Sequence, residues 1–174
     1  MKIINSTLSD IPAIFDLYAL ATAYQRKIFP GNLWPVFDKK LIEQEIVEKR
    51  QFKLLINQEI ACIWAITYND PEIWPEDDGK SSLFIHRIAT NPNYRGNNYV
   101  KIIVEWAREF AKDKQYIRLD TCGENHKLIR HYQDCGFDFL GMKKLKHAKN
   151  LPPHYDNADV CYFEIKLNQA KEPF

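Results

Sequence analysis

The sequence predicts one α/β (α+β) domain over residues 1–174, with a mixed, mostly antiparallel central sheet flanked by helices. A length of 174 residues is typical of a single domain, and no linker or repeat divides the chain. Hydrophobic residues make up 45% of the chain, which indicates a packed core. Strand and helix patterns follow one another in the order β-α-α-β-β-β-α-β-α-β-β, which favours antiparallel hairpins first and a strand–helix–strand–helix–strand unit after them.

The N-terminal part is predicted to hold one short strand and two helices. Thr7 is the expected N-cap of the first helix, with Asp10 as the carboxylate of a capping box, and apolar residues at helical spacing carry this helix to about Tyr24. Asp38 is the expected N-cap of the second helix. In chain order the expected ranges are a strand at 2–6, a helix at 7–24, an aromatic, turn-rich loop or broken helix at 25–37, and a helix from 38.

The rest of the chain alternates strands with two further helices. Asn57-Gln58-Glu59 joins two β-rich runs and indicates a hairpin, and Gly136 ends the last helix as a C-cap glycine does. The expected strands are 52–57, 60–68, 82–90, 116–122, 137–142 and 160–167. The expected helices are about 100–114 and 124–135, and the expected loops are 69–80 and 143–158.

Composition excludes several classes of function. With 24 basic and 23 acidic side chains the net charge is +1, which argues against binding nucleic acid through bulk positive charge. No apolar run approaches the ~20 residues of a membrane span, and the first residues lack the apolar stretch of a signal peptide. The four cysteines form no CxxC pair and are expected to be reduced packing residues, which agrees with a cytoplasmic protein: Cys62, Cys122, Cys135 and Cys161.

No metal site is predicted, because the histidines outside the strands have no ligand spacing: His126, His131, His147 and His154. The turn Asn91–Tyr99 is more informative. It precedes a helix start, whose free N–H groups carry about half a positive charge, and it contains Arg95, Gly96 and two asparagines that tolerate left-handed backbone. These features fit a diphosphate cradle, and they equally fit an ordinary surface turn with a solvated arginine.

Two runs in this half resemble the signatures of GNAT-type N-acetyltransferases. The run from Leu83 to Gly96 resembles the acetyl-CoA motif, whose turn reads Arg/Gln-x-x-Gly-x-Gly/Ala. Arg95 matches that turn, whereas Asn98 and Val100 replace its two small residues. The second run is similar to the family's downstream signature over Leu119-Asp120-Thr121, Asn125, Leu128, Tyr132 and Gly136-Phe137.

The resemblance implies a fold in which a splayed pair of parallel strands admits acetyl-CoA as the acyl donor. The backbone of three residues would then pair with the pantetheine arm: Ile88, Ala89 and Thr90. Six residues would hold the diphosphate: Arg95, Gly96, Asn97, Asn98, Tyr99 and Val100. Asn125 would bind the pantetheine amide region, and Tyr132 would lie near the sulfur.

Acetyl transfer to an amine needs a neutral amine and an acid for the leaving thiolate. Tyr132 is the candidate acid, or else a core tyrosine. His86 is a candidate base, because strand alternation would place it on the same face as Ile88, or else a satisfied core histidine. Asp120 is a second proton acceptor or substrate anchor, or else a strand-end cap or an ion-pair partner of Arg87 or Arg118.

The acceptor pocket is expected to come from three loops: the aromatic 24–37, the acidic 72–78 and the basic 143–155. Aromatic rings beside acidic groups suit an ammonium-bearing acceptor, although the acidic run also fits a solvated surface. The sequence therefore predicts an acetyl-CoA-dependent N-acetyltransferase for the primary amine of a small molecule. The alternatives are a non-catalytic acyl-CoA-binding or regulatory module and an interaction protein, and the resemblance further implies a homodimer through the last strands.

Overall fold

The protein, described by a computed structural model over residues 1–75, 81–146 and 150–167, is built on a seven-stranded sheet. The strand order is β1-β2-β3-β4-β5-β7-β6. The bounds are β1 Lys2–Asn5, β2 Gln51–Ile56, β3 Glu59–Thr67, β4 Ser82–Thr90, β5 Tyr116–Cys122, β6 Asp138–Lys144 and β7 Asp159–Lys166. Within these ranges β4 and β5 are parallel and the other neighbouring pairs are antiparallel, which confirms the predicted mixed, mostly antiparallel sheet.

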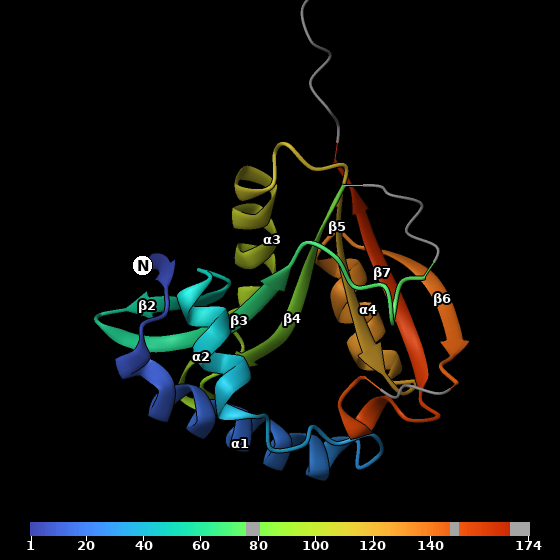
Figure 1. Cartoon of the computed structure of the whole chain (residues 1–174), viewed down its shortest axis with the longest axis horizontal. Coiled ribbons are helices and arrows are strands. Elements are labelled where there is room, and N and C mark those ends of the chain that lie inside the picture. Colours follow the sequence, from blue (N-terminus) through green and yellow to red (C-terminus); the bar gives the residue numbers. More distant parts are fainter. Residues whose placement is uncertain (76–80, 147–149, 168–174) are drawn as a thin grey trace, which may run out of the picture.

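Helices cover both faces of the sheet (Figure 1). Their bounds are α1 Ile11–Ile28, α2 Lys39–Val47, α3 Tyr99–Phe110 and α4 His126–Asp134. Side chains of α1 and α2 share one apolar cluster with Ile63 and Ala89, whereas α3 and α4 contribute to a larger cluster on the opposite face. None of the helices in the described ranges combines the length and the apolar character needed to cross a bilayer.

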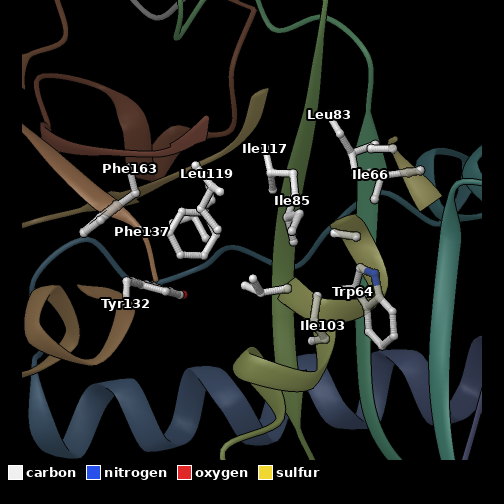
Figure 2. Packing of buried hydrophobic residues seen from close by; sticks show 14 of the residues in the cluster. Trp64, Ile66, Leu83, Ile85, Ile103, Ile117, Leu119, Tyr132, Phe137 and Phe163 are labelled. Carbon is white, nitrogen blue, oxygen red and sulfur yellow. The ribbon is translucent and has the colours of Figure 1, made fainter. Parts of the chain in front are cut away.

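The larger cluster fills the space between the sheet and the α3–α4 layer (Figure 2). Trp64, Ile103 and Phe163 are fully or almost fully buried there. Burial of side chains of this size stabilises the fold by roughly 1.5–3 kcal/mol each. The cluster therefore fixes α3 and α4 against the middle of the sheet, where β4 and β5 lie.

β4 and β5 separate soon after they meet. Their pairing covers only Ser82–Phe84 with Tyr116–Arg118, and no β5 partner is paired with the rest of β4. In Figure 1 the two strands diverge from the top of the view downwards. This is the splayed parallel pair that the sequence resemblance implied, and it leaves one side of the β4 backbone without a neighbouring strand over Ile85–Thr90.

A bulge interrupts β4 at Arg87. Ile63 pairs with Ala89 and Ala65 with His86, so two residues of β4 face one residue of β3. Arg87 has a φ of 51°, a left-handed value that is uncommon outside glycine. The bulge reverses the side-chain alternation, so the expectation that His86 and Ile88 share a face is wrong. Ile88 packs with the larger cluster, while His86 contacts Thr67 on the other side.

Most element boundaries agree with the sequence prediction to within a few residues. The main difference is α1, which continues four residues past Tyr24 to Ile28, where the Phe29 N–H still bonds to the Gln25 carbonyl. The Thr7–Asp10 capping box is present, but it caps a 3₁₀ turn, Leu8–Asp10, that leads into α1. Asp38 caps α2 as predicted, accepting a hydrogen bond from the Lys40 N–H. The four cysteines are free thiols.

Candidate active site

A cavity of about 780 Å³ opens where β4 and β5 diverge. Its walls come from β4, the end of β5, the C-terminal part of α1, α4, and the loops after α1, β3 and β6. The side chain of Val100 lines this cavity without closing it. The splayed strands therefore enclose a space large enough for a small-molecule ligand.

The turn that precedes α3 forms one end of the cavity. Arg95 and Gly96 line it, and the Arg95 guanidinium stacks 4.0 Å from the centre of the Tyr24 ring. Asn98 is the residue before α3 and adopts the left-handed conformation, with a φ of 49°, so it supplies the backbone that a glycine supplies elsewhere. The start of α3 presents free N–H groups beside this turn, an arrangement that favours a phosphate.

The other turn residues play different parts. The Asn97 side chain donates to the Tyr94 carbonyl at 2.8 Å, and Tyr99 is buried in the larger apolar cluster. The Asn98 side chain accepts a hydrogen bond from the Cys135 thiol at 3.2 Å. Asn97, Asn98 and Tyr99 are thus not among the residues that line the cavity.

The β4 residues expected beside a pantetheine arm, Ile88, Ala89 and Thr90, do line the cavity. Asn125 lines it from the opposite wall. Its side-chain oxygen caps α4 by accepting the Leu128 N–H at 3.2 Å, which leaves the amide NH₂ as its free hydrogen-bonding group. Asn125 can therefore donate a hydrogen bond from this NH₂ group toward a ligand in the cavity.

Tyr132 lies on α4, and its ring contacts the aromatic rings of Phe137 and Phe163 (Figure 2). Its side chain is almost completely buried but lines the cavity, and its hydroxyl has no hydrogen-bond partner among the described residues. Burial raises the pKa of Tyr132 well above that of a free phenol, so it stays protonated at neutral pH. The hydroxyl is therefore a proton donor that is not hydrogen bonded to any of the described residues.

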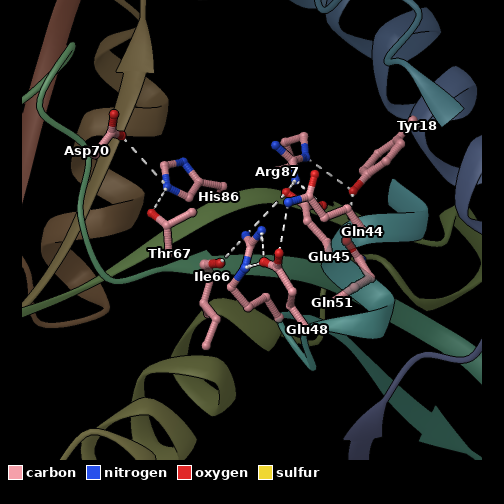
Figure 3. A network of polar contacts seen from close by, with 11 residues as sticks. Tyr18, Gln44, Glu45, Glu48, Gln51, Ile66, Thr67, Asp70, His86 and Arg87 are labelled. Atoms are coloured by element: carbon pink, nitrogen blue, oxygen red, sulfur yellow. Dashed lines mark hydrogen bonds and ion pairs between the residues drawn. The ribbon is translucent and has the colours of Figure 1, made fainter. Parts of the chain in front are cut away.

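His86 is held as a neutral side chain (Figure 3). Its Nε2 is hydrogen bonded to Thr67 Oγ1 at 2.9 Å and lies 3.7 Å from Asp70 Oδ2. Burial, with the charges of Arg87 and Arg50, lowers the pKa of His86 to about 3. A base this weak does not take a proton from an ammonium near neutral pH, which argues against the base role and favours the alternative interpretation of His86 as a satisfied core histidine.

Asp120, at the end of β5, is the better proton acceptor. It accepts a hydrogen bond from the Tyr155 hydroxyl at 2.7 Å, and burial raises the pKa of Asp120 to about 6. The two arginines considered from sequence as its ion-pair partners each contact a glutamate. Arg87 contacts Glu45, and Arg118 donates to Glu164 at 2.7 Å.

Asp70, in the loop after β3, completes a group that the sequence did not reveal. One ligand atom from each of Asp70, His86 and Asp120 lies within 4.8 Å of the others, a geometry that could hold a metal ion. Burial, followed by the charges of Asp120 and Glu72, raises the pKa of Asp70 to about 7. These residues are 16 or more positions apart, so only the fold brings them together.

Two of the three predicted acceptor loops meet over the cavity. Phe29 and His154 line it, and the Asn32 amide donates to the His154 carbonyl at 3.0 Å. The acidic loop contributes differently from the prediction. Glu72 is exposed and accepts from Asn150 at 2.8 Å, and residues 76–78 lie outside the described part of the chain, as does His147.

Comparison with known proteins agrees with this arrangement. The sequence model described as the acetyltransferase (GNAT) family matches residues 16–137. A curated relative, the uncharacterized N-acetyltransferase YesJ of Bacillus subtilis (strain 168), is 27% identical over 74 residues. That match spans 41% of this chain and 41% of the relative's length.

Solved structures share the fold over nearly the whole chain. A GNAT-family acetyltransferase from Listeria monocytogenes has a TM-score of 0.72 at 20% identity, covering 95% of this chain and 94% of its own. The ribosomal-protein-S18-alanine N-acetyltransferase from Escherichia coli has a TM-score of 0.66 at 16% identity, and the match covers 99% of this chain and 97% of that chain. The spermidine N-acetyltransferase of Vibrio cholerae, as a mutant, has a TM-score of 0.64 at 16% identity, covering 95% of each chain.

Proposed function

Because this chain belongs to the acetyltransferase (GNAT) family, we propose that it transfers the acetyl group of acetyl-CoA to the primary amine of a small molecule by direct attack. The observation that carries the proposal is the cavity between β4 and β5. It brings a phosphate-favouring helix start, a free tyrosine hydroxyl and a carboxylate with a raised pKa into one space.

The donor occupies the side of the cavity formed by β4 and the turn before α3. The diphosphate lies at the start of α3 beside Arg95, and the free edge of β4 from Ile88 to Thr90 hydrogen bonds to the pantetheine arm as an added strand does. Asn125 donates its amide NH₂ to the same arm. Asn98 stands where the family turn has a glycine, and it adopts the left-handed backbone conformation that a glycine there would adopt.

The chemistry divides between Tyr132 and the carboxylates. An alkylamine has a pKa of about 10.4, so it arrives as an ammonium and must lose a proton before it attacks. Asp120, with a pKa of about 6, accepts that proton. The nitrogen then forms the bond to the thioester carbonyl, the carbon–sulfur bond breaks, and Tyr132 donates its proton to the leaving sulfur, so that CoA leaves as the thiol. The second proton that the nitrogen loses as the amide forms returns to the Tyr132 oxygen.

A second function has one observation in its favour. Asn98 and Val100 stand where the family turn has Gly and Gly or Ala, and Val100 adds a branched side chain at the cavity wall. This substitution fits a non-catalytic acyl-CoA-binding or regulatory module of the same fold. The free thiols agree with a cytoplasmic protein in either case, and a homodimer remains a prediction.

One pair of measurements separates the two functions. Free-thiol release from acetyl-CoA is followed across a library of primary amines, and the melting temperature is measured with and without CoA. An enzyme gives amine-dependent thiol release and a raised melting temperature. Stabilisation by CoA without thiol release for any amine supports the binding module, and no stabilisation by CoA rules out both.

A further inference from the structure

We infer that Asp70 binds the ammonium group of the acceptor together with Asp120. The inference rests on the proposed function and adds a binding residue to the same site. Asp70 and Asp120 both line the cavity, and their carboxylate oxygens lie within 4.8 Å of each other.

The first support is an unsatisfied oxygen. Asp70 Oδ2 is buried and has no hydrogen-bond donor among the described residues, and the side chain as a whole is 11% exposed. The His86 ring at 3.7 Å is too distant for a hydrogen bond and is occupied by Thr67 at 2.9 Å. A buried carboxylate oxygen without a donor is costly, which points to a partner that arrives with the substrate.

The second support is that no cationic side chain of the described residues is among the groups that shift the pKa of Asp70 or of Asp120. Arg87 and Arg50 are the guanidinium groups that act on His86, and both are engaged by glutamates, Arg87 by Glu45 and Arg50 by Glu48. His86 itself is neutral. Within residues 1–75, 81–146 and 150–167, the hydrogen bond that Asp120 accepts comes from the uncharged Tyr155 hydroxyl. A cation entering the cavity is therefore the group that would balance the two carboxylates.

The third support is that the Asp70 backbone is fixed before any ligand arrives. Its carbonyl accepts the N–H groups of Ile73 and Trp74, at 3.2 and 2.7 Å. Ile73 and Trp74 are buried in an apolar cluster with Phe84 of β4. The carboxylate is thus held at the cavity wall by the core, which is the preorganisation that a binding residue requires.

The test measures binding and does not depend on turnover. Melting temperatures are recorded at pH 8 and constant ionic strength with n-butylamine, 1-butanol or aniline, each with and without CoA. The cation n-butylammonium should stabilise the wild type, whereas 1-butanol of the same shape and neutral aniline should not. Asp70→Asn should reduce the n-butylammonium shift to less than a third, with the CoA shift unchanged.

The matched control is Glu72→Gln. Glu72 contributes a like charge near Asp70, but it is exposed and does not line the cavity, so this variant should keep the full n-butylammonium shift. Equal shifts in the two variants, or equal stabilisation of the wild type by 1-butanol, would overturn the inference. Mg²⁺ or Zn²⁺ that binds through Asp70 and prevents the n-butylammonium shift would also overturn it. If CoA no longer raises the melting temperature while n-butylammonium still does, the result counts against the proposed function and not against the role of Asp70. The two outcomes can be told apart because the n-butylammonium shift is also measured without CoA.

Discussion

Arg87 in the β4 bulge is tied to Glu45 of α2, with its Nη2 atom 2.5 Å from both carboxylate oxygens. Figure 3 shows Arg87 and Glu45 facing each other, and Glu45 is 2% exposed. Arg87 also lies 5.3 Å from the centre of the Phe37 ring. Arg87 holds a left-handed backbone that costs about 1–3 kcal/mol in a non-glycine residue. The ion pair to α2 therefore helps to maintain the bulge that sets which β4 side chains face the cavity.

Glu45→Gln should lower the free energy of unfolding. The substitution leaves the guanidinium of Arg87 without its anion in a buried position, which typically costs about 3 kcal/mol. Urea unfolding should show a lower midpoint with an unchanged slope. Glu43→Gln on the same helix is the control, because Glu43 forms an exposed pair with Lys39 at 3.4 Å, worth less than about 0.5 kcal/mol. Equal losses in the two variants would contradict a structural role for the Arg87–Glu45 pair.

Gly123→Ala should disturb the acceptor side of the cavity. Gly123 has a φ of +83°, and a Cβ there would overlap with Cε1 of Phe29. The variant must strain its backbone and also displace Phe29, so we expect a loss of about 1–3 kcal/mol together with a changed KM for the acceptor.

The control for Gly123→Ala is Gly141→Ala. Gly141 has a φ of +102° with nothing within 4 Å of the added Cβ, so it reports the backbone cost alone. The difference between the two variants in urea unfolding isolates the Phe29 contact. Adding Phe29→Ala to Gly123→Ala should recover part of the loss, and no recovery would show that the contact does not matter.

Much of the fold could be predicted from the sequence because its signals are local. Asp38 marks the start of α2, and Gly136 lies in the turn that follows α4. The site was predicted less completely, because its decisive features are not local. A one-residue bulge at Arg87 reverses the alternation on which the interpretation of His86 depended, and no spacing rule brings Asp70 beside Asp120.

Tyr132→Phe should slow thiol release by about 10²-fold or more, the usual contribution of a general acid. The hydroxyl has no partner among the described residues, so its removal leaves the packing against Phe137 and Phe163 intact. The melting-temperature shift caused by CoA should therefore remain. Tyr68→Phe, at a half-exposed tyrosine outside the cavity, should leave the rate unchanged. An unchanged rate in Tyr132→Phe would remove Tyr132 from the acid role.

Asp70→Asn should stabilise the free protein in a pH-dependent way. Burial and the charges of Asp120 and Glu72 raise the pKa of Asp70 from 3.8 to about 7, with neutral His86 beside it. Below pH 3.8 the carboxyl is protonated in both the folded and the unfolded state. Between pH 4 and 7 only the folded state keeps the proton, so the stability of the wild type falls relative to that of the variant as the pH rises.

Above pH 7 the cost of ionising Asp70 is present in full, and we expect Asp70→Asn to be more stable there by on the order of 4 kcal/mol, or about 8–16 °C in melting temperature. The two proteins should melt within about 1 °C of each other at pH 4, as judged by the same relation. Glu72→Gln, which removes an exposed charge, should give a nearly constant offset from pH 4 to 8. If the melting temperatures of Asp70→Asn and the wild type change with pH in parallel, burial does not make the ionisation of Asp70 costly. A substrate cation would then gain nothing by pairing with an uncompensated carboxylate.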